Sequence, residues 1–156
     1  MDVLNLGTGF KPLVHEGWDI INHDLRLDPE RPWVTVAWDL NEHPWPWAEE
    51  SFDLIVACAV FEHLRRNLIE TLNECWRILR PQGVLYMKLP YWNHEISYID
   101  PTHYWQFSLR TVEIFDPDKE YGLKYRFYTD RKWKIIQVPK LNDTRSSFSV
   151  KMEVRK

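Results

Sequence analysis

Cysteine is scarce in this sequence, and long apolar runs are missing from it. The only two cysteines are Cys58 and Cys75, too few for a disulfide framework or a zinc centre built from thiolates. We expect both to be buried thiols in a reducing compartment. No segment approaches the roughly 18 consecutive apolar residues of a membrane-spanning helix, and no basic and apolar leader opens the chain. The composition therefore predicts a cytoplasmic protein that is not held in a membrane.

An excess of positive charge is also absent. Lysine and arginine number 20 against 23 aspartates and glutamates, which leaves a net charge of −3. Because no overall positive field is present to hold a polyphosphate backbone, we do not expect nucleic acid as a partner. Tryptophan, by contrast, is abundant, with nine residues. Most should lie in the core, and four in proline-flanked loops are candidates for lining a pocket: Trp45, Trp47, Trp92 and Trp105.

The length of 156 residues fits one domain, residues 1–156, with a core of useful size. Apolar residues recur at helical spacing between residues 63 and 80, and Pro81 and Gly83 are expected to end that helix. A second helix is predicted over residues 108–115, with Ser108 as its N-cap. Strands are expected over residues 3–6, 18–23, 34–38, 52–57, 83–89, 124–138 and 147–155.

These elements define a fold class. A strand, a helix and a further strand of these lengths imply a parallel crossover, whereas the alternating pattern near the C-terminus is typical of an antiparallel pair. The fold class is therefore α/β, with a doubly wound, mostly parallel sheet and antiparallel C-terminal strands. Only about eight residues separate Gly9 from Trp18, and Pro12 is among them, so no helix is expected between the first two strands.

The most informative segment is residues 3–10, which read VLNLGTGF. An apolar run of strand character ends there in a Gly-x-Gly turn, where the missing Cβ lets backbone N–H groups approach a ligand closely. Three further predicted strands end near Asp24, near Asp39 and just before Glu62. Because parallel strands deliver such residues to one edge of the sheet, the sequence predicts a ligand site at their carboxyl ends.

The order of these motifs resembles the class I S-adenosylmethionine-dependent methyltransferases. Residues 4–9 (LNLGTG) resemble the first motif of that family, and residues 39–55 resemble the stretch that leads into its fourth strand. Residues 60–64 (VFEHL) and 74–83 (ECWRILRPQG) are similar to its segment EHL followed by ExxRxLxPGG. The resemblance covers residues 2–115 and implies a Rossmann-like methyltransferase fold with S-adenosylmethionine as cofactor.

The sequence also departs from the family pattern. It starts on the first strand, so we expect a fold trimmed at the N-terminus, without the helices that usually precede this strand and cover the substrate. Asn5 stands where an acidic residue is common, and Lys11 stands where a third glycine is expected. The third glycine normally allows close packing of helix on strand, a requirement that weakens if the helix is missing.

The resemblance implies roles for individual residues. Asp24 is placed to accept the ribose hydroxyls and Asp39 the adenine amino group, with Leu40 packed on the adenine ring. The rest of the implied cofactor site is Asn5, Gly7, Thr8 and Gly9 near the amino-acid tail, with Cys58 and Ala59 beneath the cofactor. Two plainer interpretations stay open: Asp24 begins a turn with Leu25, and Asp39 caps a loop before Asn41.

Candidate catalytic residues follow the fifth predicted strand. Methyl transfer is an in-line displacement in which the protein chiefly positions the reactants, so a base is needed only if the acceptor must lose a proton. We take His103, oriented by Asp100, as the first candidate base and His94 as the second. The alternative is that Asp100 and His103 only fold their loop through Asx-turn hydrogen bonds. The six histidines match no compact ligand motif, so no metal site is expected.

These residues lead to two functional hypotheses. The first is S-adenosylmethionine-dependent methyl transfer to a small-molecule or sugar-like acceptor. The second is a module of the same fold that binds the cofactor or a partner without catalysis, which Asn5, Lys11 and the missing first helix favour. A nicotinamide-dependent enzyme is disfavoured because the third glycine is absent. Aromatic residues left uncovered over the site would favour a homodimer.

Overall fold

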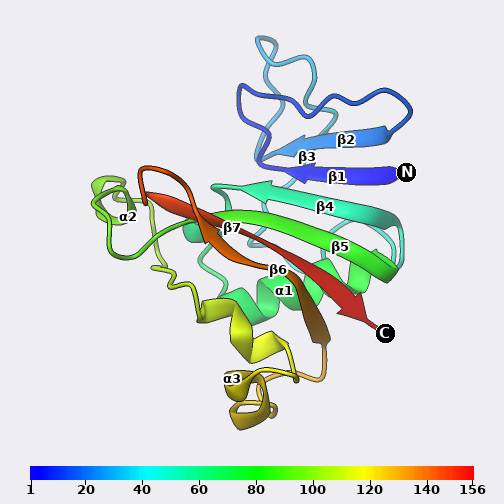
Figure 1. The fold of residues 1–156 in the computed structure, drawn as a ribbon. Helices are drawn as coiled ribbons and strands as arrows, with labels where there is room; N and C mark the ends of the chain where they lie inside the picture. The colour runs from blue at the N-terminus through cyan, green and yellow to red at the C-terminus, as the bar shows by residue number, and fades with distance from the viewer.

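The computed structural model describes all 156 residues. Its seven strands form one sheet with the strand order β3-β2-β1-β4-β5-β7-β6 (Figure 1). The first five strands are parallel where they pair, and β7 is antiparallel to both β5 and β6. This confirms the mostly parallel sheet with antiparallel C-terminal strands. The strands are β1 (Asp2–Leu6), β2 (Asp19–Asp24), β3 (Val36–Ala37), β4 (Phe52–Cys58), β5 (Leu79–Pro90), β6 (Lys132–Leu141) and β7 (Ser147–Arg155).

The helices are few and short. They are η1 (Phe61–His63), α1 (Leu68–Ile78), α2 (Ile96–Ile99), η2 (Thr111–Phe115) and α3 (Glu120–Lys124), of which η1 and η2 are 3₁₀ helices. As predicted, no helix joins β1 to β2. No helix of the structure combines the length and the apolar character that a membrane crossing requires.

The predicted helix over residues 63–80 is shorter at both ends. It begins only after Asn67, which forms a capping box with Glu70: the Asn67 side chain accepts from the Glu70 N–H, and the Glu70 carboxylate accepts from the Asn67 N–H. At the other end, β5 starts at Leu79. Pro81 and Gly83 therefore lie inside a strand instead of ending a helix, next to the irregularity where β5 pairs with the start of β4.

Two other predicted elements differ. Residues 124–131 are not a strand, because α3 and a turn occupy this stretch and β6 begins at Lys132. The predicted helix over residues 108–115 is the 3₁₀ helix η2, and Arg110, not Ser108, precedes its first residue. Ser108 still accepts a hydrogen bond from the Arg110 N–H through its hydroxyl. The third strand is limited to two residues, Val36 and Ala37, both paired with β2.

The core lies between one face of the sheet and the helices. Alternate residues of β4, β5 and β7, such as Ile55, Leu85 and Val150, are fully buried against Leu72 of α1 and Phe115 of η2. On the other face, Val56 of β4 and Tyr86 of β5 are partly exposed, whereas Val3 and Asn5 of β1 are buried. Cys58 lies at the end of β4 and is exposed, so the expectation of a buried thiol is wrong there; it is confirmed for Cys75.

Candidate functional site

Two adjoining cavities open at the carboxyl ends of the parallel strands. The first, of about 420 Å³, lies over the ends of β1 and β2, and the second, of about 440 Å³, lies over the ends of β4 and β5. Ala59 and His63, which follow β4, line both cavities. Strand order reverses between β1 and β4, and ligands of open α/β sheets bind at such a point. Both cavities therefore lie at the edge of the sheet where the sequence predicts a ligand site.

The first cavity brings together five of the residues implied as cofactor ligands. Gly7, Asp24, Asp39, Leu40 and Ala59 all line it, although they come from four separate segments of the chain. Four implied residues lie elsewhere. Asn5, Thr8 and Cys58 line a separate hollow at the turn and the end of β4, which shares only Gly7 with the first cavity, and Gly9 lines neither space.

The glycine turn after β1 is held from two sides. Gly7 has a φ of +60°, and a Cβ on it would lie 2.5 Å from Cγ2 of Val60. The Gly7 N–H donates to Nδ1 of the buried His23 at 3.4 Å, while Nε2–H of His23 donates to the Trp38 carbonyl at 2.9 Å. Burial lowers the pKa of His23, which fits a neutral ring that accepts through Nδ1. His23 lines the first cavity, and the sequence reasoning did not include it among the candidate cofactor residues.

The side chains of Asn5 and Thr8 stabilise the same turn through buried hydrogen bonds. Nδ2 of Asn5 donates to the Thr8 hydroxyl at 3.0 Å and to Oδ1 of Asn22 at 2.8 Å, and all three residues are buried. Asn22 also accepts from the Leu13 N–H and donates to the Leu13 carbonyl. Their side chains are therefore used in shaping the loop between β1 and β2.

Asp24 faces the first cavity with a largely occupied carboxylate. Its Oδ2 accepts from the Gly9 N–H and from Nη1 of Arg31, both at 2.9 Å, and its Oδ1 accepts from the Leu25 N–H at 2.7 Å. The Arg31 side chain is only 8% exposed. Asp24 thus begins a turn, as its plainer interpretation holds, and lines the cavity as well. Arg31 holds the Asp24 carboxylate in place, and no pattern in the sequence indicates this role.

Asp39 also caps a loop, as its plainer interpretation holds, and lines the first cavity as well. Its Oδ1 accepts from the backbone N–H and the side-chain amide of Asn41, at 2.9 and 2.8 Å, which caps the loop. Its other oxygen has no hydrogen bond, and the residue is exposed at the cavity. Leu40 is buried beside it and contributes an apolar surface.

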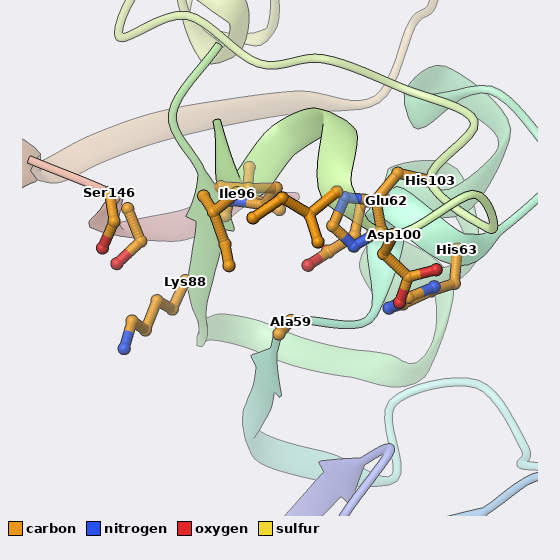
Figure 2. A pocket seen from close by; sticks show the side chains of 12 residues that line it. Ala59, Glu62, His63, Lys88, Ile96, Asp100, His103 and Ser146 are labelled. Carbon is orange, nitrogen blue, oxygen red and sulfur yellow. The ribbon is translucent and has the colours of Figure 1, made fainter. Parts of the chain in front are cut away.

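Polar and apolar groups share the second cavity. Figure 2 shows Glu62, His63, Asp100 and His103 grouped at one side, and Lys88 and Ser146 at the other. Its apolar lining comes from Leu89, Pro90, Ile96 and Ile99. His103 and Asp100 are thus where the sequence placed them. His94 does not line the cavity, because its Nδ1 accepts from the Ile96 N–H at 3.1 Å and closes a local turn.

The Asp100 carboxylate forms no hydrogen bond with the His103 ring, and the two residues are joined only by the His103 N–H, which donates to the Asp100 carbonyl at 3.2 Å. Asp100 accepts instead from the N–H and the hydroxyl of Thr102, at 2.8 and 2.6 Å, so the Asx-turn interpretation holds for this carboxylate. The Thr102 hydroxyl in turn contacts Nδ1 of His63 at 2.9 Å. Asp100 therefore orients His63 through Thr102. The rings of His63 and His103 lie edge to face, with centroids 4.7 Å apart.

Glu62 is the most unusual group of the second cavity. It is 1% exposed, and its Oε2 is buried without a hydrogen-bond partner. Desolvation is the main cause that raises the pKa of Glu62 to about 7. Sequence reasoning treated Glu62 only as part of the EHL motif, where nothing distinguished its burial from that of an ordinary helix-starting acid.

None of the four tryptophans proposed for a pocket lines either cavity. Trp45 is buried in the core, and Trp47 packs against the core. Trp92 and Trp105 are 46% and 37% exposed, and Trp105 donates to the Leu64 carbonyl. The chain between Trp45 and Trp47 therefore does not cover the site, and the homodimer stays a prediction.

Comparisons with known proteins agree with this arrangement. Residues 19–87 match the methyltransferase domain family. No curated protein matches the chain. One similar structure is the complex between the Haloferax volcanii Trm112 methyltransferase activator and a methyltransferase, with a TM-score of 0.63 and 16% identity over 99% of this chain and 83% of that one.

Two further structures have the same fold. A SAM-dependent methyltransferase from Archaeoglobus fulgidus gives a TM-score of 0.62 and 16% identity, covering 97% of this chain and 85% of that one. One from Aquifex aeolicus gives 0.62 and 17%, covering 99% and 82%. The matched segment includes residues 39–55, 60–64 and 74–83, which carried part of the resemblance, and the fold is the one that the resemblance implies.

Proposed function

We propose that this protein, which has the class I methyltransferase fold and the methyltransferase domain family's segment, binds S-adenosylmethionine in the first cavity and methylates a small molecule in the second. The observation that carries the proposal is the convergence of Gly7, Asp24, Asp39 and Leu40 on one cavity that adjoins another through Ala59. The cofactor's sulfonium methyl carries the chemistry, and the protein's task is to place the two reactants in line.

The first cavity offers a partner for each part of the cofactor. Asp24 Oδ1 accepts one backbone hydrogen bond and keeps a lone pair for a ribose hydroxyl. The free oxygen of Asp39 is placed to accept from the adenine amino group, and Leu40 packs against the ring. The Gly7 turn lets the amino-acid tail approach the backbone, since no Cβ blocks it.

The second cavity suits a small acceptor with both apolar and polar parts. Ile96, Ile99 and Leu89 would contact an apolar portion, while Lys88 and Ser146 face it with polar groups. His103 contacts the Ser97 carbonyl through Nδ1, so its Nε2 lone pair is available as a base for an acceptor hydroxyl. Ala59, the smallest side chain between the cavities, leaves room for the methyl group to pass.

The alternative function is cofactor or partner binding without catalysis. Its support is the Asp24 carboxylate, which already accepts three hydrogen bonds and has little capacity left. Isothermal titration with S-adenosylmethionine and with its demethylated product separates the possibilities. Binding of either ligand supports the proposed cofactor site, and turnover of methyl-labelled cofactor with a panel of small acceptors then identifies catalysis. Binding of neither ligand would leave only a partner-binding role.

The Asp39→Asn variant tests the site itself. Asparagine keeps the oxygen that Asn41 uses but replaces the free oxygen with an amide that cannot accept a hydrogen bond. Loss of a hydrogen bond to a charged group, roughly 1.5–3 kcal/mol, should weaken cofactor binding by about tenfold or more. Asp130→Asn makes the same charge change at an exposed position outside both cavities. Equal affinities of the two variants would reduce Asp39 to a loop cap.

A further inference from the structure

Three metal-binding side chains meet at the edge of the second cavity. Glu62 and His63 are neighbours in η1, whereas His103 comes from the loop that follows α2. One carboxylate oxygen and one ring nitrogen from each histidine all lie within 4.8 Å of one another. Forty residues of chain separate His63 from His103, so the spacing of histidines in the sequence could not indicate this cluster.

Hydrogen bonds fix the tautomer of His63. The Thr102 hydroxyl has a single hydrogen, and the Asp100 carboxylate at 2.6 Å can only accept it. At its 2.9 Å contact with His63, the hydroxyl must therefore accept, so Nδ1 of His63 carries the proton. Nε2 is then left with its lone pair. A relay from a carboxylate to the far nitrogen of a histidine is the usual support of a metal ligand.

His103 is fixed in the same way. Its Nδ1 lies 3.4 Å from the Ser97 carbonyl, which can only accept, so Nδ1 is the protonated nitrogen and Nε2 keeps its lone pair. In both rings Nδ1 faces a protein acceptor, and Nε2 is the nitrogen left for a ligand.

Glu62 supplies the third donor and an independent reason for a ligand. The residue is 99% buried by area, and its Oε2 has no hydrogen-bond partner. A buried carboxylate without a partner is costly, and a bound cation removes that cost.

We propose that Glu62, His63 and His103 bind a divalent first-row transition cation, through one carboxylate oxygen and the two Nε2 atoms. Two imidazoles and a carboxylate suit Zn²⁺, Mn²⁺ or Fe²⁺, whereas Mg²⁺ and Ca²⁺ prefer oxygen ligands. All three residues line the second cavity, so a cation held there would be accessible to an acceptor bound in it.

The consequence for methyl transfer rests on the proposed function. A hydroxyl of the acceptor would bind the cation, which lowers the hydroxyl pKa. Its proton then leaves to solvent water, its oxygen forms the bond to the methyl carbon as the bond from carbon to sulfur breaks, and the sulfonium becomes a neutral thioether. His103 would then be a ligand of the cation and not the base.

The experiment uses protein without a histidine tag, stripped with a chelator and titrated with Co²⁺, whose visible d–d bands report imidazole ligation, and with Zn²⁺ by calorimetry. We expect one equivalent to bind. His103→Gln and Glu62→Gln should each weaken binding by about 10-fold or more. His94→Gln, which removes a nearby histidine outside the cluster, should not change it. Thermal unfolding checks that each variant is folded, and His103→Gln remains informative if the buried Glu62 variant is not.

Three results would overturn the proposal: no bound cation, wild-type affinity in His103→Gln, or an equal loss in His94→Gln. Titration with S-adenosylmethionine in the presence of the chelator separates this failure from that of the proposed function. Cofactor binding without cation binding would leave the cofactor site and the His103 base in place. Cation binding without cofactor binding would support the cation site and refute the proposed cofactor site.

Discussion

Replacing Gly7 with alanine should be more damaging than the same change at Gly9, two residues away. Both glycines have a positive φ, +60° and +54°, and an L-residue there costs roughly 1–2 kcal/mol. At Gly9 nothing lies within 4 Å of an added Cβ, so this backbone cost is the whole effect. At Gly7 the Cβ would lie 2.5 Å from Cγ2 of Val60, which is 8% exposed and packed in the core.

The size of the difference follows from that contact. Forcing an extra carbon into a packed core costs about 1–3 kcal/mol, so Gly7→Ala should lose roughly 2–5 kcal/mol in total. For a protein of this size one kcal/mol lowers Tm by about 2–4 °C, which predicts a drop of about 2–8 °C for Gly9→Ala and about 4–20 °C for Gly7→Ala. Because Gly7 and Val60 line the first cavity, the Gly7 variant should also bind S-adenosylmethionine more weakly.

Differential scanning calorimetry of the two variants is the measurement. Gly7→Ala combined with Val60→Ala removes the close contact, so the double variant should be more stable than the sum of the two single losses predicts. Equal Tm values for Gly7→Ala and Gly9→Ala, or simple additivity in the double variant, would show that Val60 does not restrict the turn.

Two further outcomes concern the groups that hold the first cavity. Arg31→Met leaves the Asp24 carboxylate without its buried guanidinium and should lower the free energy of unfolding, measured in urea, by about 1–3 kcal/mol. The control Arg66→Met breaks a half-exposed pair with Glu70 and should lower it by under about 0.5 kcal/mol. Similar losses in the two variants would contradict the role given to Arg31. Burial lowers the pKa of His23 below its usual value of 6.5, so the unfolded chain takes up a proton there that the folded protein does not. Stability should therefore be complete above about pH 6.5 and decline as the pH falls below it, and His23→Gln should make unfolding curves between pH 7 and 5 less dependent on pH; an unchanged dependence would place the proton uptake elsewhere.

Much of the sheet could be predicted because its parallel strands are buried. Strands β1 and β4 are short, mostly apolar runs bounded by turn residues, and this pattern has few other interpretations. Segments governed by local contacts were harder. Leu64 continues the helical spacing of α1, yet the capping box at Asn67 decides where the helix begins. Tyr125 and Phe127 alternate as in a strand, but Tyr125 stacks on Tyr121 and Tyr128 around α3.

The candidate site divides in the same way. Residues that follow a strand directly, such as Gly7, Asp24 and Asp39, could be placed from topology alone, since parallel strands end at one edge. Contacts between distant loops could not. The pairing of Arg31 with Asp24 and the approach of His103 to Glu62 depend on loop conformations that leave no periodic pattern in the sequence.

Ala59 and His63 belong to both cavities, and this shared boundary has a thermodynamic consequence. Two guests bound on either side of it contact the same pair of residues, so the affinity for one depends on whether the other is present. By thermodynamic linkage, the factor by which a bound acceptor changes the affinity for S-adenosylmethionine equals the factor by which bound S-adenosylmethionine changes the affinity for the acceptor. Heterotropic cooperativity would then arise in this small protein from a boundary that two side chains form, without any movement of domains.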